Sequence, residues 1–312
     1  MGQMRRMSLR LATFNVENLM NRFDFSGFRN ELNQDRVLSL YQIRDEAEYR
    51  QLEAARAVAL TDDARQLSAL AIAAARADIL CLQEVDNIEA LRAFEYGYLY
   101  KMIGSGYREK YTTTGNDGRG IDVAVMVREQ TRHGQRIEFV RMQSHAHLTY
   151  AELGLHTPEL AALGEEPHER IFRRDCLELD LRVDGKPLTI YTVHFKSMGS
   201  PRNGMDGREA TMPIRMGEAA AVRHIIEERF GRDHAAGKRW AICGDLNDYR
   251  ERIVISGDMH EGYAFAPTRE ERSCLDALTQ GGFCENVVER LPEIDRWTLY
   301  HTRGPAERHL CQ

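Results

Sequence analysis

Short apolar runs that end in polar residues recur along the chain. They lie at residues 11–18, 77–85, 118–128, 188–198 and 240–249. Runs of this length, without helical spacing of the apolar positions, are typical of buried β-strands. The pattern therefore predicts five strands, each of which delivers polar side chains to one of its ends.

Helical spacing marks the segments between these strands. Residues 24–66 read as a polar, helical insertion, in which residues 45–59 are rich in good helix formers. A helix is predicted over residues 64–75, with Leu67, Leu70, Ala71 and Ala74 on one face. A second helix is predicted over residues 214–230, with Ala219, Val222, Ile225 and Ile226 turned inward.

The remaining segments favour loops and one hairpin. Residues 112–120 form a turn-rich loop, residues 143–169 a loop with at most one short helix, and residues 198–213 a Gly-, Pro- and Arg-rich loop. Strands at residues 171–183 and 188–193 are joined by Asp184 and Gly185, a strong hairpin signal. We expect one domain over residues 1–312.

Composition describes a globular protein with enough apolar material for a core. Of the 312 residues, 43% are hydrophobic and 29% charged. The sequence contains no apolar run of about 18 residues, so it predicts no membrane span. The basic segment at residues 1–10 leads into a polar-tipped strand rather than a signal segment. The six cysteines lack paired or metal-type spacing, which favours reduced thiols and a cytoplasmic location.

The net charge of −6, from 48 acidic and 42 basic residues, argues against affinity based mainly on counterion release from a long polyanion. A local basic rim remains compatible with a nuclease. Arginines cluster at positions 170, 173 and 174, and again at 202, 208 and 215. For most of them, a solvated surface is the favoured interpretation.

The polar residues at the strand ends are the candidates for chemistry. Strand alternation predicts that Asp245 and Asn247 point the same way, and that His194 and Lys196 do so too. The other tips carry Asn15, Glu84 and Asp122. A single such residue is more often a surface or packing residue. Five strand-tip clusters together favour a functional site.

The order and wording of these motifs resemble the endonuclease/exonuclease/phosphatase superfamily, which includes DNase I-like nucleases, inositol-phosphate 5-phosphatases and neutral sphingomyelinases. The matching motifs are FNVEN around Asn15, LQEV around Glu84, VHFKS around His194 and GDLND around Asp245, between residues 11 and 249. The resemblance implies an α/β fold with two mixed β-sheets packed face to face and helices outside, a four-layer DNase I-like sandwich.

If the chain hydrolyses phosphoesters, as the resemblance implies, each of these residues has an expected role. Glu84 would hold Mg²⁺ or Mn²⁺, with Asn15 and Asp245 supporting the metal. Asp245 would orient or deprotonate the attacking water, and Asn247 and Lys196 would bind phosphoryl oxygens. His194 would donate to the phosphate or protonate the leaving group, with Asp122 as a candidate to hold its tautomer.

The sequence departs from the superfamily at its C-terminal end. Members close with an Asp-bearing strand and an Asp-His pair, whereas this sequence ends at residues 308–312 without them. Asp233 and His234 precede the Asp245 strand and so stand in the wrong place, and His301 and His309 have no adjacent Asp. We expect a truncated form that lacks its last strands; an active-site variant is the alternative.

Two classes of function stay open at this point. The first is a metal-dependent phosphodiesterase, foremost a nuclease, with a phosphomonoesterase acting on inositol or sugar phosphates as an alternative. The second is a catalytically dead module that uses the cleft to bind anions. The expected partner is nucleic acid or another phosphoester, and no protein partner is evident. A sphingomyelinase-like action is disfavoured because the sequence shows no basic amphipathic helix or apolar anchor.

Overall fold

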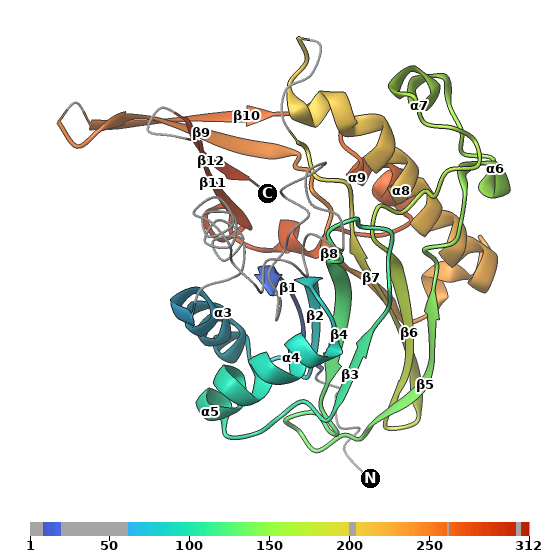
Figure 1. Cartoon of the computed structure of the whole chain (residues 1–312), viewed down its shortest axis with the longest axis vertical. Coiled ribbons are helices and arrows are strands. Elements are labelled where there is room, and N and C mark those ends of the chain that lie inside the picture. The colour runs from blue at the N-terminus through green and yellow to red at the C-terminus, as the bar shows by residue number, and fades with distance from the viewer. Residues whose placement is uncertain (1–8, 20–61, 200–203, 261, 304–306, 312) are drawn as a thin grey trace, which may run out of the picture. The chain divides into compact units, whose positions relative to one another are not determined.

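The computed structural model describes residues 9–19, 62–199, 204–260, 262–303 and 307–311 (Figure 1). Most of the expected helical insertion at residues 24–66 lies outside these ranges. The chain divides into two compact units. The first unit comprises Met1–Leu148, Phe172–His194 and Arg239–Asp245; the second comprises Thr149–Ile171, Phe195–Lys238 and Leu246–Gln312.

The first unit contains two mixed four-stranded sheets. One has the order β1-β2-β4-β3, with β1 at Leu11–Leu19, β2 at Ile79–Val85, β4 at Asp122–Val127 and β3 at Glu109–Thr112. The other has the order β5-β6-β7-β8, with β5 at Ile137–Ser144, β6 at Cys176–Val183, β7 at Lys186–His194 and β8 at Trp240–Asp245. In each sheet one strand pair is parallel: β1 with β2, and β7 with β8.

The two sheets pack face to face through a shared apolar core. Ile79, Cys81, Val123 and Val125 of one sheet join Leu177, Leu179, Leu181 and Ile190 of the other in one buried cluster. Neighbouring residues of β2, such as Leu80 and Leu82, point to the opposite face and are buried there as well. A strand buried on both faces reads as a continuous apolar run, so the pattern predicted it correctly.

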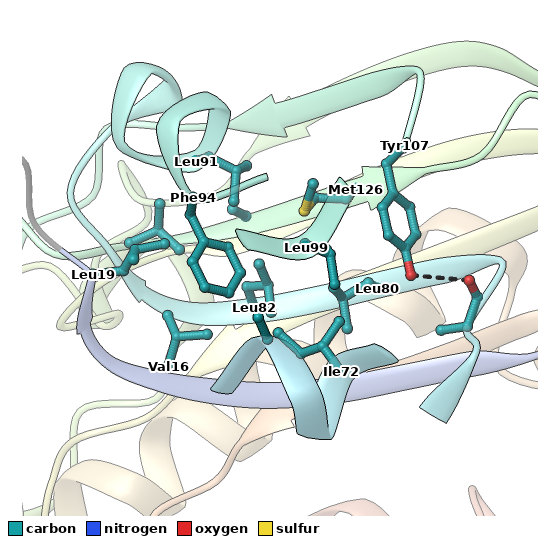
Figure 2. Packing of buried hydrophobic residues seen from close by; sticks show 14 residues of the cluster. Val16, Leu19, Ile72, Leu80, Leu82, Leu91, Phe94, Leu99, Tyr107 and Met126 are labelled. Atoms are coloured by element: carbon teal, nitrogen blue, oxygen red, sulfur yellow. Dashed lines mark hydrogen bonds between the residues drawn. The ribbon is translucent and has the colours of Figure 1, made fainter. Parts of the chain in front are cut away.

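Helices cover the other face of the β1-β2-β4-β3 sheet. They are α3 (Asp62–Ala75), α4 (Ile88–Phe94), the π-helix η3 (Glu95–Leu99) and α5 (Tyr100–Ile103). Figure 2 shows their packing, in which Ile72 and Phe94 approach Leu82 and the Tyr107 hydroxyl donates to the Ala77 carbonyl at 3.0 Å. This two-sheet arrangement with covering helices confirms the predicted fold class.

The predicted inner face of α3 was wrong. Among the described residues, Leu67 and Leu70 are 66% and 54% exposed, whereas Ala69 and Ile72 are buried. Ala71 and Ala74 are also exposed. Amphipathic spacing alone did not distinguish the two faces, because alanines and larger apolar residues occur on both.

Helices dominate the first part of the second unit. They are α6 (Tyr150–Leu153), α7 (Pro158–Leu163), α8 (Gly207–Phe230) and the 3-10 turn η4 (Ala235–Gly237). Residues 143–169 thus hold two short helices rather than at most one, each capped by a threonine. Helix α8 begins at Gly207 with an Asp206 cap and contains Pro213, so the loop predicted through residue 213 was too long. The four inward residues predicted for it are buried.

A third, antiparallel sheet in the second unit was not expected. Its order is β10-β9-β12-β11, with β9 at Glu251–Asp258, β10 at Gly262–Arg269, β12 at Glu307–Cys311 and β11 at Leu299–Arg303. The short helices α9 (Leu275–Thr279), η5 (Gln280–Gly282), η6 (Val287–Arg290) and η7 (Glu293–Asp295) lie between β10 and β11 in the sequence. Every residue of β10 is exposed, including Tyr263 and Phe265, so this strand is not a buried one.

The predicted hairpin is present with a shorter first strand. Strand β6 begins at Cys176 rather than at residue 171, and Val183 pairs with Lys186 across the two-residue turn. Asp184 and Gly185 have φ values of 47° and 75°, as a type I′ turn requires. No helix in the described part of the chain is long and apolar enough to cross a membrane.

Candidate active site

Four of the predicted residues come together on strands of the first unit. They are Asn15 on β1, Glu84 on β2, His194 at the end of β7 and Asp245 at the end of β8. His194 and Asp245 are neighbours in the parallel β7–β8 register. Because β1 and β8 belong to different sheets, the cluster joins the tips of both sheets of the sandwich.

An irregular backbone aims the Glu84 side chain. Strand β2 pairs with β1 and with β4, and both pairings shift register around Glu84. Glu84 also has a φ of 67°, in the left-handed region that side-chain-bearing residues rarely adopt. A bulge re-aims a side chain relative to regular alternation. Strain of this kind at a residue carrying chemistry is common in functional sites.

The amide of Asn15 joins two carboxylates. Its Nδ2 donates to Glu84 Oε1 at 3.3 Å and to Asp245 Oδ2 at 2.9 Å. Its Oδ1 accepts from the backbone N–H of Glu17 at 2.9 Å, which orients the amide. The second Glu84 oxygen accepts from the backbone N–H of Asn18 at 3.0 Å. Asn15 therefore fixes the carboxylates with its nitrogen, and its oxygen is already engaged.

His194 lies beside the same two carboxylates and is almost fully buried. Its Nε2 is 3.9 Å from Glu84 Oε1 and 4.0 Å from Asp245 Oδ2. Burial, reinforced by the nearby charge of Arg174 and opposed by Asp245, lowers the pKa of His194 to about 3. The imidazole is therefore neutral near pH 7. Its buried Nδ1 has no hydrogen-bond partner among the described residues.

A buried arginine near His194 escaped the sequence interpretation. Arg174 is 3% exposed, and its Nε lies 2.9 Å from Asp117 Oδ2. Arg119 contacts the same carboxylate through two nitrogens at 3.1 Å. Arg208 and Arg215 are buried as well, so the favoured interpretation of a solvated surface was wrong for three of the five described arginines in the two clusters. The signal was weak, because nothing in an arginine cluster reveals which member is buried.

Asp122 lies at the start of β4 and contacts a loop backbone. Its Oδ1 accepts from the Gly115 N–H at 2.7 Å, whereas the carboxylates within 4.0 Å of His194 Nε2 are those of Glu84 and Asp245. Burial raises the pKa of Asp122 from 3.8 to about 6, with Gly115 lowering it and Asp175, Asp117 and Asp86 adding to the rise. Its role as the partner of His194 stays a prediction.

Strand alternation does not apply to the pairs Asp245/Asn247 and His194/Lys196 as expected. Strand β8 ends at Asp245 and β7 ends at His194, so Asn247 and Lys196 lie beyond the strands, in the second unit. Asn247 has a φ of 48° and donates through Nδ2 to the Phe195 carbonyl at 3.0 Å. The Lys196 Nζ donates to the Ser197 carbonyl at 3.3 Å.

The glycine of the GDLND motif has a packing reason. A Cβ on Gly244 would lie 2.0 Å from the Val193 carbonyl oxygen, which is a severe clash. Only glycine permits β8 to run this close to β7 immediately before Asp245. The motif therefore combines a close strand approach with the carboxylate that follows it.

The donor set fits a hard divalent cation. Glu84 and Asp245 converge on one amide and one neutral imidazole, so their negative charges are only partly offset. Within the described ranges, no group of three or more His, Cys, Asp and Glu side chains is arranged to hold a metal. Mg²⁺ commonly uses one or two carboxylates and keeps several waters. The two carboxylates are compatible with that mode.

The chain belongs to the Endonuclease/Exonuclease/phosphatase family, whose model matches residues 12–276. Members of this family are metal-dependent hydrolases. The match includes all of the predicted site residues. No curated protein matches the chain.

Several solved structures resemble the chain at low identity. TDP2 from D. rerio in complex with a single-strand DNA product shares 14% identity over 79% of this chain and 76% of its own, with a TM-score of 0.42. Humanized D. rerio TDP2 shares 15% over 77% and 62%, with a TM-score of 0.39. ANGEL2, a 2′,3′-cyclic phosphatase, shares 14% over 58% and 42%, with a TM-score of 0.35. The alignments thus cover 62% of humanized TDP2 and 42% of ANGEL2.

Proposed function

We propose that this protein is a divalent-metal-dependent phosphodiesterase that acts on nucleic acid. The observation that carries the proposal is the convergence of Glu84 and Asp245 on the Asn15 amide, beside the buried neutral imidazole of His194. Membership of a family of metal-dependent hydrolases supports the same reaction class.

Glu84 and Asp245 would hold the metal ion, and Asn15 would keep their carboxylates in place. When bound, Mg²⁺ or Mn²⁺ would neutralise charge on the phosphoryl group and assist activation of water. Asn15 suits a positioning role because both of its N–H groups are directed at carboxylate oxygens. The Asn18 backbone N–H would restrain Glu84 from the other side.

The remaining residues would bind the substrate and move protons. Neutral His194 carries one N–H and one bare nitrogen, so it can donate to a phosphoryl oxygen. Asp245 would orient or deprotonate the attacking water. Lys196 and Asn247 would bind phosphoryl oxygens. Each follows His194 or Asp245 by two residues, which limits the Cα separation within each pair to about 7 Å.

Charge balance alone does not separate a diester from a monoester. Two carboxylates and one divalent cation sum to zero, and Asp117 offsets part of the charge of Arg119 and Arg174. A phosphodiester brings one negative charge, whereas a phosphomonoester brings nearly two near neutral pH. The Lys196 ammonium and the arginine charge that Asp117 leaves uncompensated could meet either substrate, so the substrate panel below decides between them.

The proposal can be tested with the full chain in two measurements. The first titrates Mg²⁺ and Mn²⁺ by calorimetry against the wild type and Glu84→Gln, which removes one charge with little change in volume. We expect affinity to fall about tenfold or more because a carboxylate ligand is lost. The second measures hydrolysis of single- and double-stranded DNA, RNA, inositol phosphates and sugar phosphates, with each metal and with a chelator.

The outcomes separate the candidate functions. Metal-dependent cleavage of nucleic acid supports the proposal, whereas turnover of monoesters alone would identify a phosphomonoesterase. Metal and phosphate binding with no turnover on any substrate would identify an anion-binding module. Equal metal affinity in the wild type and Glu84→Gln would remove Glu84 from the site.

A further inference from the structure

Side chains hold three successive backbone groups just after β7. The Phe195 carbonyl accepts from Asn247 Nδ2 at 3.0 Å. The Lys196 N–H donates to Glu218 Oε2 at 2.7 Å, and the Lys196 carbonyl accepts from an Arg215 nitrogen at 3.4 Å. All of these residues belong to the second unit. The backbone on both sides of the Lys196 side chain is therefore restrained.

One face of helix α8 supplies these contacts. Arg208, Thr211, Arg215 and Glu218 follow one another at intervals of three and four residues, as positions on one helical face do. Thr211 Oγ1 lies 3.1 Å from the Met198 carbonyl and 2.6 Å from the Arg215 guanidinium. A Cβ on Gly207 would lie 2.1 Å from the Gly199 carbonyl. The helix thus lies directly against the segment that follows β7.

The same helix holds the segment around Asn247. Arg208 Nε donates to Asp248 Oδ1 at 2.7 Å, and another Arg208 nitrogen donates to the Tyr249 carbonyl at 3.1 Å. Asp248 Oδ2 accepts from the Ser273 hydroxyl at 2.9 Å and from the Cys274 N–H at 2.7 Å. Both loops that carry candidate phosphate-binding residues are therefore attached to α8.

The two α8 side chains that contact the Lys196 backbone are fully buried. Arg215 and Glu218 are both 0% exposed. Buried charged side chains often contribute no more stability than apolar residues of the same volume. Their presence beside Lys196 is better explained by the directed contacts that Glu218 and Arg215 make with the Lys196 N–H and carbonyl.

We propose that Glu218 and Arg215 are positioning residues that set the Lys196 backbone so that its ammonium can bind a phosphoryl oxygen. They act through Lys196 and do not touch the substrate. This inference rests on the proposed function, because the binding of phosphate by Lys196 is itself part of that proposal. It adds a determinant of substrate affinity that lies on a helix outside all the matched motifs.

Two conservative variants of Glu218 separate the effect of its side-chain length from the effect of its charge. Glu218→Asp keeps the charge that offsets Arg215 but withdraws the carboxylate by one methylene from the Lys196 N–H. Glu218→Gln keeps the reach and an acceptor oxygen but loses the charge. The probe is inorganic phosphate, titrated against the full chain in the presence of Mg²⁺. Positioning predicts that Glu218→Asp weakens phosphate binding about tenfold, as loss of a charged hydrogen bond would, while Glu218→Gln stays near the wild type.

A double-mutant cycle with Lys196→Ala provides the second readout. If Glu218 acts through Lys196, Glu218→Asp should weaken phosphate binding much less when Lys196 is already alanine. Amide hydrogen exchange at Lys196 should accelerate in Glu218→Asp and not in Glu218→Gln. The matched controls are Glu227→Asp and Glu227→Gln on the same helix, where Glu227 pairs with Arg223 and Arg232. They should leave phosphate affinity and Lys196 exchange unchanged.

The possible results assign failure to one proposal or the other. A larger loss in Glu218→Gln than in Glu218→Asp, or additive effects with Lys196→Ala, would overturn positioning and leave a structural role for the buried charges. If Lys196→Ala itself leaves phosphate affinity unchanged, the phosphate role of Lys196 in the proposed function fails, and the positioning role fails with it.

Discussion

The strand tips of the first unit and the α8 face of the second unit both gather charged residues, partly buried at the tips and buried along α8, but they arrange the charges differently. At the tips, the carboxylates of Glu84 and Asp245 share one neutral amide and lie near a neutral histidine. Along α8, opposite charges pair directly, as in the 2.7 Å contact between Arg208 and Asp248, whose side chains are 7% and 0% exposed.

This difference suggests what each region contributes. Carboxylates held close together repel one another, so their convergence costs stability unless a cation joins them. Opposite charges that are buried and hydrogen-bonded are costly to break, because removing one leaves the other uncompensated. Substitutions at the tips should therefore mainly lower activity, and substitutions in the α8 network should mainly lower the free energy of unfolding.

The largest expected effect is on stability and comes from Asp248→Ala. This change leaves Arg208 buried without its carboxylate and removes the acceptor for Ser273 and Cys274. We expect unfolding free energy to fall by about 3–5 kcal/mol, measured by chemical denaturation. Glu89→Ala is the control, because the Glu89–Arg92 pair is solvent-exposed and should contribute about 0–1 kcal/mol. Similar losses in both variants would end the contrast between the two regions.

A smaller free-energy effect, on function, is expected at the tips. Asp245→Asn and Asn247→Ala should each lower turnover by about 100-fold or more, as loss of a positioned base or donor does. The thermal midpoint should change little in both, and Asp245→Asn also relieves carboxylate repulsion. Steady-state kinetics and thermal melts on the same preparations check this. Strong destabilisation with retained activity would assign both residues to the turn alone.

The smallest effect concerns pH and Asp122, which lies among other carboxylates of the first unit. Its folded pKa of about 6 exceeds the ordinary 3.8, chiefly because of burial. The folded state therefore binds the proton more tightly, so this contribution to stability is present below about pH 4 and is lost as pH rises through about 6. Asp122→Asn should gain thermal midpoint relative to the wild type between pH 4 and pH 7. A constant difference across that range would contradict the raised pKa.

The buried strands of the fold could be predicted because their sequence carries the whole signal. Strands β2 and β4 are apolar on both faces, and any such run of this length needs two covering layers. Strand β10 also carries apolar residues, from Tyr263 to Pro267, yet all of its residues are exposed, so its run does not mark a buried strand. The third sheet depends on pairing between segments far apart in the sequence, such as β9 with β12, and no local pattern specifies that pairing.

The candidate site, like the fold, was predictable only where a local sequence pattern marks the residues. Asn15, Glu84, His194 and Asp245 follow apolar runs directly, and three of them lie at or next to a strand end, whereas Asn15 lies in the middle of β1. Arg174, Arg215 and Glu218 carry no comparable local signal, and their burial depends on the packing of the folded chain. The argument that relates Asp245 to Asn247 assumed that the strand continues, whereas β8 ends at Asp245, so their common direction stays a prediction.

The sequence by itself determined which segments are buried strands, which residues follow them and which family the motifs resemble, because these properties depend on neighbouring residues. Only the tertiary structure decided that one asparagine amide joins two carboxylates 69 and 230 residues away, and which face of α8 restrains the backbone of Lys196. Such contacts depend on directed hydrogen bonds between distant segments, and their geometry exists only once the sheets and helices have packed.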